Sequence, residues 1–201
     1  MLLKQNGIMN EYSKIAGKIA SAYQHLSPEP LREFAGILEP VKLKKGEILL
    51  DKGQILRSMV YVDTGMLRQF YYKKGKDVTE HFGCEGTVVY CINSLFKEQP
   101  TDLMIEAIVE PTLIYTVNYR KLCGLIEKYG EIAIMFRRIL EDGLIISQNK
   151  ADSWRFETAR ERYNRFIKDF PDAAKRASIN DIASYLLMAP ESLSRVRSGA
   201  L

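Results

Sequence analysis

The hydrophobic pattern divides the chain into a helical start, a β-rich middle and a helical end. In roughly the first 38 residues, Ile15 and Ile19 recur at helical spacing. Ser27-Pro28-Glu29-Pro30 then opens a second helix that we expect to run from Leu31 to Leu38. We expect this segment to serve in packing, with no chemistry of its own.

Between Val41 and Val117 the pattern changes to short runs of β-forming residues separated by glycines. The runs Met59-Val60-Tyr61-Val62 and Leu67-Arg68-Gln69-Phe70-Tyr71-Tyr72 predict strands. Hairpin turns are predicted at Lys44-Lys45-Gly46-Glu47 and Lys73-Lys74-Gly75-Lys76, because glycine readily adopts positive φ. This spacing is typical of an all-β meander or roll.

From about Tyr119 the pattern is helical again, and a heptad seam runs along the predicted long helix. Its members alternate by four and three residues and are Ile132, Phe136, Ile139, Gly143 and Ile146. A glycine inside a helix is unfavourable by about 1 kcal/mol, which close approach of a second helix would justify. The seam therefore fits either a dimer axis or a helix buried on its own β-roll. Four arginines follow between Arg155 and Arg165; such a run is usually a solvated face, although some of them could contact phosphates.

The segment from Ser178 to Arg197 predicts two short helices around a tight turn. Ser178 is placed to cap the first helix, and Asp181 approximates a capping box. Pro190 ends that helix and suits the first turn of the next, where a proline loses no hydrogen bond. We expect Leu193 and Val196 to pack inward while the polar residues between them face out. The pattern fits a helix-turn-helix and, about equally well, an ordinary helical hairpin with a solvated basic face.

The residue types at successive positions of this segment favour the helix-turn-helix over the plain helical hairpin. Asp181-Ile182-Ala183, Tyr185-Leu186 and Pro190-Glu191-Ser192-Leu193-Ser194-Arg195-Val196-Arg197 resemble the DNA-recognition motif of the Crp/Fnr family of bacterial transcription regulators. The chain departs from the family at Leu187, where the usual residue is a glycine; a left-handed conformation there costs a non-glycine residue on the order of 1 kcal/mol. Lys44-Lys45-Gly46-Glu47-Ile48-Leu49 and Tyr61-Val62-Asp63-Thr64-Gly65-Met66-Leu67-Arg68 resemble the cyclic-nucleotide-binding β-roll of the same family.

This resemblance implies an α+β fold. It consists of an N-terminal double-stranded β-helix (the jelly-roll-like cyclic-nucleotide-binding fold), a long dimerisation helix and a C-terminal helix-turn-helix domain. We expect residues 1–150 to form the sensor with its dimerisation helix, and residues 151–201 the DNA-binding domain. Because the sequence ends at Leu201, we expect no C-terminal β-hairpin wing of the kind many relatives have.

The resemblance also implies a set of DNA-binding residues on the second helix of the motif. Arginine suits the O6 and N7 atoms of guanine, glutamate suits the cytosine amine, and other polar groups position the phosphate backbone. We therefore expect base contacts from Glu191, Ser192 and Arg195, and backbone positioning by Ser194 and Arg197.

An effector pocket is expected inside the roll. Cyclic-nucleotide binders of this fold carry a Gly-Glu pair and, about ten residues later, Arg-Ser or Arg-Thr, whereas this chain has Tyr90-Cys91 and Thr101-Asp102 there. No arginine lies between Arg68 and Arg120, and an aspartate would repel a phosphate. We expect no useful binding of cyclic AMP or cyclic GMP. Either another small effector, apolar or aromatic, contacts these four residues, or the roll is only a scaffold.

The amino-acid composition excludes few classes of protein. An apolar content of 46% and a charged content of 27% are ordinary for a soluble globular protein, and the net charge of +4 permits nucleic-acid binding without arguing for it. No apolar run approaches the roughly 20 residues of a membrane span, and the amino terminus lacks the apolar core of a secretion signal. Three cysteines without paired spacing suggest a reducing cytoplasm.

Candidate chemistry is sparse. His81, Cys84 and Cys91 lie close in sequence, but their spacing matches no familiar zinc ligand set. No nucleophile with its base, phosphate loop or pair of carboxylates stands out. We expect no metal, no cofactor and no enzymatic activity.

These observations predict a cytoplasmic, homodimeric transcription regulator that binds double-stranded DNA and has no membrane partner. Whether it also has a small-molecule effector, and of what identity, is left open by the sequence. The alternative is a ligand-binding or protein-interaction module of the same fold that has lost DNA binding. Leu187 at the turn and the absent wing favour that alternative. A free-standing ligand sensor without regulatory output is a weaker third reading.

Overall fold

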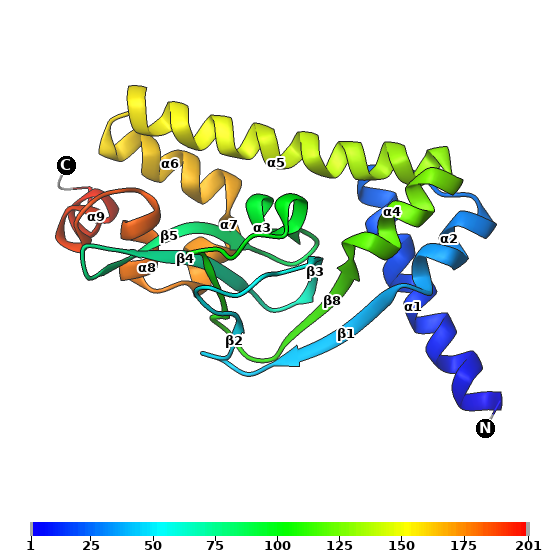
Figure 1. The fold of residues 1–201 in the computed structure, drawn as a ribbon. Helices are drawn as coiled ribbons and strands as arrows, with labels where there is room; N and C mark the ends of the chain where they lie inside the picture. The colour runs from blue at the N-terminus through cyan, green and yellow to red at the C-terminus, as the bar shows by residue number, and fades with distance from the viewer. Residues whose placement is uncertain (1, 200–201) are drawn as a thin grey trace.

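The computed structural model describes residues 2–199, with side chains from Glu11 onward, and places helices at both ends of a β-roll (Figure 1). Helices α1 (Leu2–Tyr23) and α2 (Pro28–Ala35) come first. The second helix is shorter than expected, because it ends at Gly36, where the Gly36 N–H donates to the Arg32 carbonyl and the Ile37 N–H donates to the Phe34 carbonyl. Leu38 therefore does not continue the helix and instead begins the first strand.

Within the described residues the roll consists of two four-stranded antiparallel sheets. The first has the order β1 (Leu38–Leu43), β8 (Thr112–Asn118), β3 (Ser58–Thr64) and β6 (Val88–Val89). The second has the order β2 (Ile48–Leu50), β7 (Met104–Ala107), β4 (Leu67–Lys73) and β5 (Lys76–Gly83). The short helix α3 (Ile92–Lys97) follows β6. The apolar core between the sheets includes Val60, Val62, Leu67, Ile105 and Ile114.

The two lysine-rich turns differ. At Lys73–Lys76 the chain forms the predicted hairpin between β4 and β5, with Lys74 at φ 51° and Gly75 at φ 76°. Gly46 also has a positive φ of 81°. The predicted hairpin at Lys44–Glu47 is nevertheless wrong, because β1 pairs with β8 whereas β2 pairs with β7 in the other sheet.

Helix α4 (Tyr119–Lys128) leads into α5 (Gly130–Phe156), which extends along the length of the molecule (Figure 1). Ile132 and Ile139 are buried with α1 and the roll, so this part of the predicted seam packs within the chain. Within this chain, a Cβ on Gly143 would collide with the Tyr90 hydroxyl, so the close approach of a tyrosine ring accounts for the glycine.

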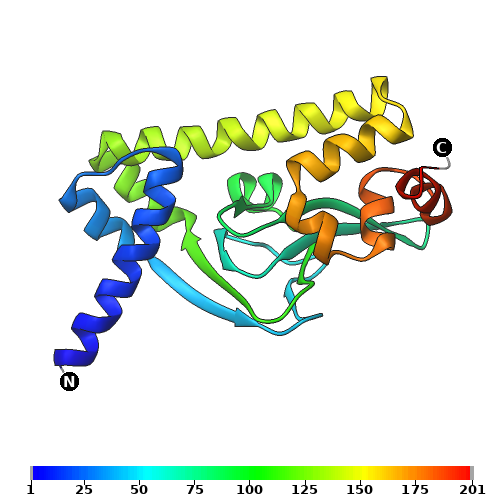
Figure 2. The same ribbon diagram turned by 180° about the vertical axis from the view of Figure 1, so that it is seen from behind.

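Beyond α5 the chain reverses. Thr158 and Glu161 form a capping box that begins α6 (Ala159–Asp169), and Arg165 on this helix donates to Glu157 at the end of α5. Helices α7 (Pro171–Arg176), α8 (Ile179–Tyr185) and α9 (Pro190–Arg197) follow. Both ribbon views place α6 alongside the C-terminal part of α5 (Figures 1 and 2).

Candidate functional site

Helices α8 and α9 form two short helices around a tight turn, as the sequence predicts. The Ser178 hydroxyl accepts the N–H of Asp181, and Pro190 occupies the first helical position of α9. Leu193 and Val196 are buried against the neighbouring helices, so α9 presents its other face to solvent. The capping box is incomplete, because the Asp181 carboxylate is engaged elsewhere.

The turn forms despite its non-glycine residue. Leu187 lies in the left-handed region at φ 51°, and its N–H donates to the Ser184 carbonyl. The N–H of Met188 donates to the Ala183 carbonyl, which completes the hydrogen-bond pattern of a Schellman motif. Leu187 therefore adopts a strained backbone conformation, and the turn still has the hydrogen bonds of this motif.

The predicted DNA-binding residues lie on the outer side of α9. Glu191, Ser194, Arg195 and Arg197 are exposed, and Ser192 is partly exposed. Leu193, between them, is the residue that anchors the helix. Within the described residues these five side chains form no hydrogen bond or ion pair with the β-roll, so the charged face of α9 is open to a partner.

Helix α8 is docked on the outer face of the β4–β5 hairpin, and a buried arginine joins the two. Arg68 on β4 is 4% exposed and forms ion pairs with Asp181 of α8 and with Asp77 of β5. Its Nε also lies 3.3 Å from Glu106 Oε1 on β7, without a well-formed hydrogen bond. Three carboxylates thus surround one guanidinium, and only Asp181 belongs to the helix-turn-helix.

Further contacts extend this docking along β5. The Thr79 N–H donates to Ser184 Oγ over 3.1 Å, so the helix satisfies a backbone donor on the edge strand. Phe82 packs on Phe166 of α6 and on Tyr185 of α8. Figure 2 shows these C-terminal helices, in orange and red, lying over the sheet.

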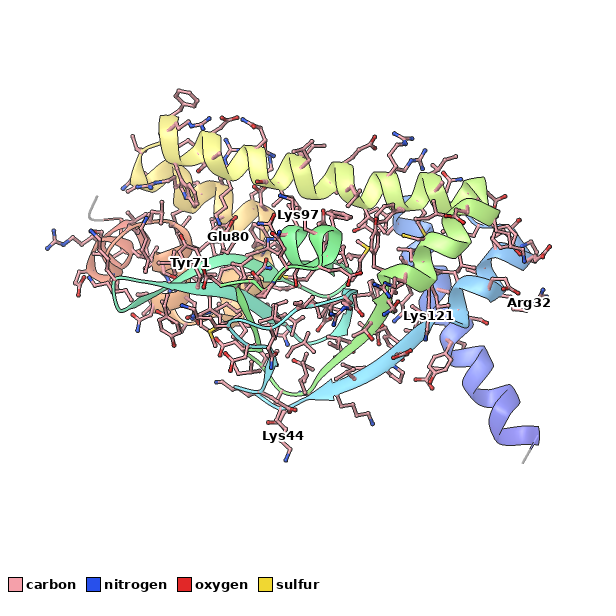
Figure 3. The ribbon with its side chains drawn as sticks, in the orientation of Figure 1. Arg32, Lys44, Tyr71, Glu80, Lys97 and Lys121 are labelled. Carbon is pink, nitrogen blue, oxygen red and sulfur yellow. The ribbon has the colours of Figure 1, made fainter. Side chains whose placement is uncertain are left out.

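A second buried cation joins α5 to the same region. Lys150 donates to the backbone carbonyl of Glu80, a residue at the bulge in β5, and lies 3.0 Å from its carboxylate. Its ammonium also lies over the rings of Trp154 and Tyr185, at 4.7 and 5.0 Å from the centroids. Burial lowers the pKa of Lys150, and the Glu80 carboxylate opposes that shift. Figure 3 places Glu80 between the sheet and the helices above it.

A cavity of about 810 Å³ lies between the roll, α5 and the C-terminal helices. Tyr90, Cys91 and Thr101, three of the four residues predicted for an effector pocket, line it. Asp102 does not line it: its side chain is exposed and pairs with Lys52 at 3.3 Å. The Nε of Arg162, a further lining residue, is buried without a hydrogen-bond partner within the described structure.

Burial shifts the pKa values of two thiols and one imidazole at this cavity toward the neutral form. Burial raises the pKa of Cys91 to about 11, against the opposing hydrogen bond that Gln69 donates over 2.9 Å. Burial also raises the pKa of Cys84 to about 11, and burial together with Lys150 lowers the pKa of His81 to about 4. Among the described residues, no group of three or more His, Cys, Asp or Glu is arranged to hold a metal ion.

No protein-family model and no curated protein matches the sequence. Solved structures do match. FixK2 from Bradyrhizobium japonicum superposes with a TM-score of 0.70 at 20% identity, over 81% of this chain and 84% of that one. The catabolite activator protein of Thermus thermophilus gives 0.56 at 17% identity, over 90% and 85%. A regulator assigned to the Crp/Fnr family from Eubacterium rectale gives 0.65 at 14% identity, over 87% and 83%.

The chain has the Crp/Fnr fold. The predicted architecture of β-roll, long helix and C-terminal helix-turn-helix is therefore confirmed. Solved structures with sequence identities this low establish the fold of the chain but not the roles of its individual residues. Over its described part, no helix is long and apolar enough to cross a membrane.

Sequence reasoning missed the residues that join the β-roll to the helix-turn-helix. Lys150 lies in a polar stretch of the chain and gave no signal. Arg68 lies in a predicted strand next to Leu67, and alternation along the strand places it on the outer face, where a charged residue is usually solvated. Its partner Asp181 lies 113 positions away along the chain, beyond the reach of any local pattern.

Proposed function

We propose that this protein is a DNA-binding transcription regulator in which α9 enters the major groove. The observation that carries the proposal is the exposed polar face of α9, presented by a helix-turn-helix in which Leu193 and Val196 anchor α9 by being buried. Arg195 and Glu191 are suited to direct contact with base edges, while Ser194 and Arg197 are suited to phosphates. Leu187 does not argue against this function, because the turn is formed.

The test is a gel shift with the DNA upstream of the protein's own gene. Arg195→Ala should weaken specific binding by about 1–3 kcal/mol and relax specificity at one base pair. Lys168→Ala, which removes an exposed cation from α6, is a matched control. Equal loss on the specific and on a scrambled duplex would contradict base recognition by Arg195, and no shift with either duplex would favour a module without DNA binding.

We further propose a homodimer formed through α5. The exposed face of this helix carries large apolar side chains, with Leu144 70% exposed and Ile145 55% exposed. They lie on a different side of α5 from the buried residues Ile132 and Ile139. A twofold partner would cover them and place two copies of α9 about one duplex turn apart. Leu144→Glu should produce monomers in analytical ultracentrifugation.

For the roll, we propose an effector other than cyclic AMP or cyclic GMP. Thr101 and Asp102 occupy the positions where the phosphate-binding arginine would be needed, and Tyr90 and Cys91 those of the Gly-Glu pair. Arg68 is committed to the opposite face of its sheet. Calorimetry that detected micromolar binding of either nucleotide would overturn this. We also propose the division at residue 150 into a sensor domain and a DNA-binding domain, a boundary that falls within α5.

A further inference from the structure

The tip of the β4–β5 hairpin concentrates positive charge. Lys73, Lys74 and Lys76 are all exposed around a turn in which Lys74 and Gly75 both have positive φ. The carboxylate next in sequence, Asp77, is paired with the buried Arg68 and does not neutralise them. Within residues 2–199 no ion pair engages any of the three lysines.

The hairpin is held beside the helix-turn-helix. Arg68 joins Asp77, one residue from the turn, to Asp181 in the first turn of α8. The Thr79–Ser184 hydrogen bond continues the attachment along β5. Both ribbon views show the hairpin ending at the same end of the molecule as α9 (Figures 1 and 2).

This position matters because the first helix of a helix-turn-helix crosses the DNA backbone while the second enters the groove. A hairpin fixed to the first turn of α8 therefore reaches the phosphates that flank the contacts of α9. Lysine suits that role, because its flexible ammonium acts as a point charge toward phosphate. Solvation of an ordinary turn is the competing explanation, and edge hairpins often carry lysines that prevent sheet-to-sheet association.

We propose that Lys73, Lys74 and Lys76 form a second DNA-contacting surface, which binds phosphates beside the site read by α9. The inference rests on the proposed DNA-binding function and extends it to the β-roll. Because phosphates carry no sequence information directly, this surface supplies affinity and not specificity. If the hairpin and α9 contact the same duplex, α8 must stay docked on β4–β5 when the protein binds DNA.

The chain contains its own matched control. Lys44-Lys45-Gly46 repeats the Lys-Lys-Gly pattern at an exposed turn with a positive-φ glycine. Figure 3 places Lys44 at the lower edge of the roll, away from the C-terminal helices. K73Q/K74Q and K44Q/K45Q therefore remove the same charge from exposed turns, and only the first pair adjoins the helix-turn-helix.

The experiment measures affinity against salt concentration for the full chain, with the duplex upstream of its own gene and a scrambled duplex of equal length. Each lost phosphate contact should reduce the slope of log K against log salt by about 0.9. For K73Q/K74Q we expect a reduction of up to about 1.8 and at least roughly tenfold weaker binding at 0.1 M salt, equally on both duplexes. K44Q/K45Q should match the wild type.

Equal slopes for the two double variants would overturn the proposed surface while DNA binding by α9 stood. Equal weakening by both pairs would also overturn it, because net charge would then account for the effect. If the wild type bound neither duplex, the proposed function itself would fail and this inference with it. Thermal melts of both variants should match the wild type, since each substitution lies at an exposed turn.

Discussion

The ion pair between Arg68 and Asp181 should measurably hold the helix-turn-helix on the β-roll. Asp181→Asn keeps the size of the side chain and removes its charge. Arg68 is 4% exposed and the Asp181 side chain 15% exposed, so solvent screens this pair little. A hydrogen bond to a charged group contributes about 1.5–3 kcal/mol. Because Asp77 and Glu106 still compensate the guanidinium after the change, we expect a loss of about 2 kcal/mol.

Two measurements test this magnitude. The melting temperature should fall by about 4–8 °C for a chain of this length. The amide of Thr79, which donates to Ser184 Oγ across the interface, should exchange with solvent about 30-fold faster, the factor that corresponds to about 2 kcal/mol. The amide of Ile114, in the core between the sheets, should change less, because the helix-turn-helix can detach while the roll stays folded.

Asp181 also lies in the first turn of α8, where a carboxylate stabilises the helix by about 0.3–1 kcal/mol. Glu191→Gln, which removes a first-turn carboxylate from α9 without touching Arg68, is the control for that contribution. A double-mutant cycle with Arg68→Met isolates the pair, and we expect a coupling of at least about 1 kcal/mol. Additive effects, or an unchanged Thr79 exchange rate, would refute the reasoning.

Three further predictions concern individual positions. Gly143→Ala should destabilise the protein by about 1–3 kcal/mol through collision with the Tyr90 hydroxyl, and a Tyr90→Phe background should recover most of that loss in chemical denaturation. Leu187→Gly should be more stable than Leu187→Ala by about 1 kcal/mol, because glycine alone relieves the strain at φ 51°; equal melting temperatures would contradict this. The pKa of His81 is lowered from 6.5 to about 4, so the unfolded chain takes up its proton first and stability should fall as pH drops from about 6.5 to 4. The loss should be on the order of 3 kcal/mol and absent in His81→Gln, with His25→Gln as the control.

Local features were predictable from the sequence because their causes lie within a few residues. The positive φ at Gly75, the cap at Ser178 and the helix start at Pro190 each follow from the chemistry of the residue itself. The inward positions of Leu193 and Val196 follow from helical spacing. The fold as a whole was reached only through the resemblance of these motifs to Crp/Fnr regulators, since spacing alone also allowed a plain helical hairpin.

The wrong predictions concern contacts between residues far apart in the sequence. The turn at Lys44–Glu47 has the predicted glycine, but strand β1 pairs with β8, some 70 residues further along the chain, and no local signal specifies that choice. The small residue at Gly143 correctly indicated a close approach, yet whether a second helix or the Tyr90 ring comes near depends on how α5 lies on the roll.

The amino-acid sequence by itself determined the elements, the turn chemistry and the polar outer face of α9, because these depend on backbone preferences and on periodicity. Only the tertiary structure decided that α8 lies against β4–β5, that Arg68 and Lys150 are buried between them, and that the lysines of the hairpin end beside the helix-turn-helix. Those contacts join residues about 70 to 110 positions apart. Their energy comes from pairs of buried charges that the fold brings together, so no local stretch of sequence specifies them.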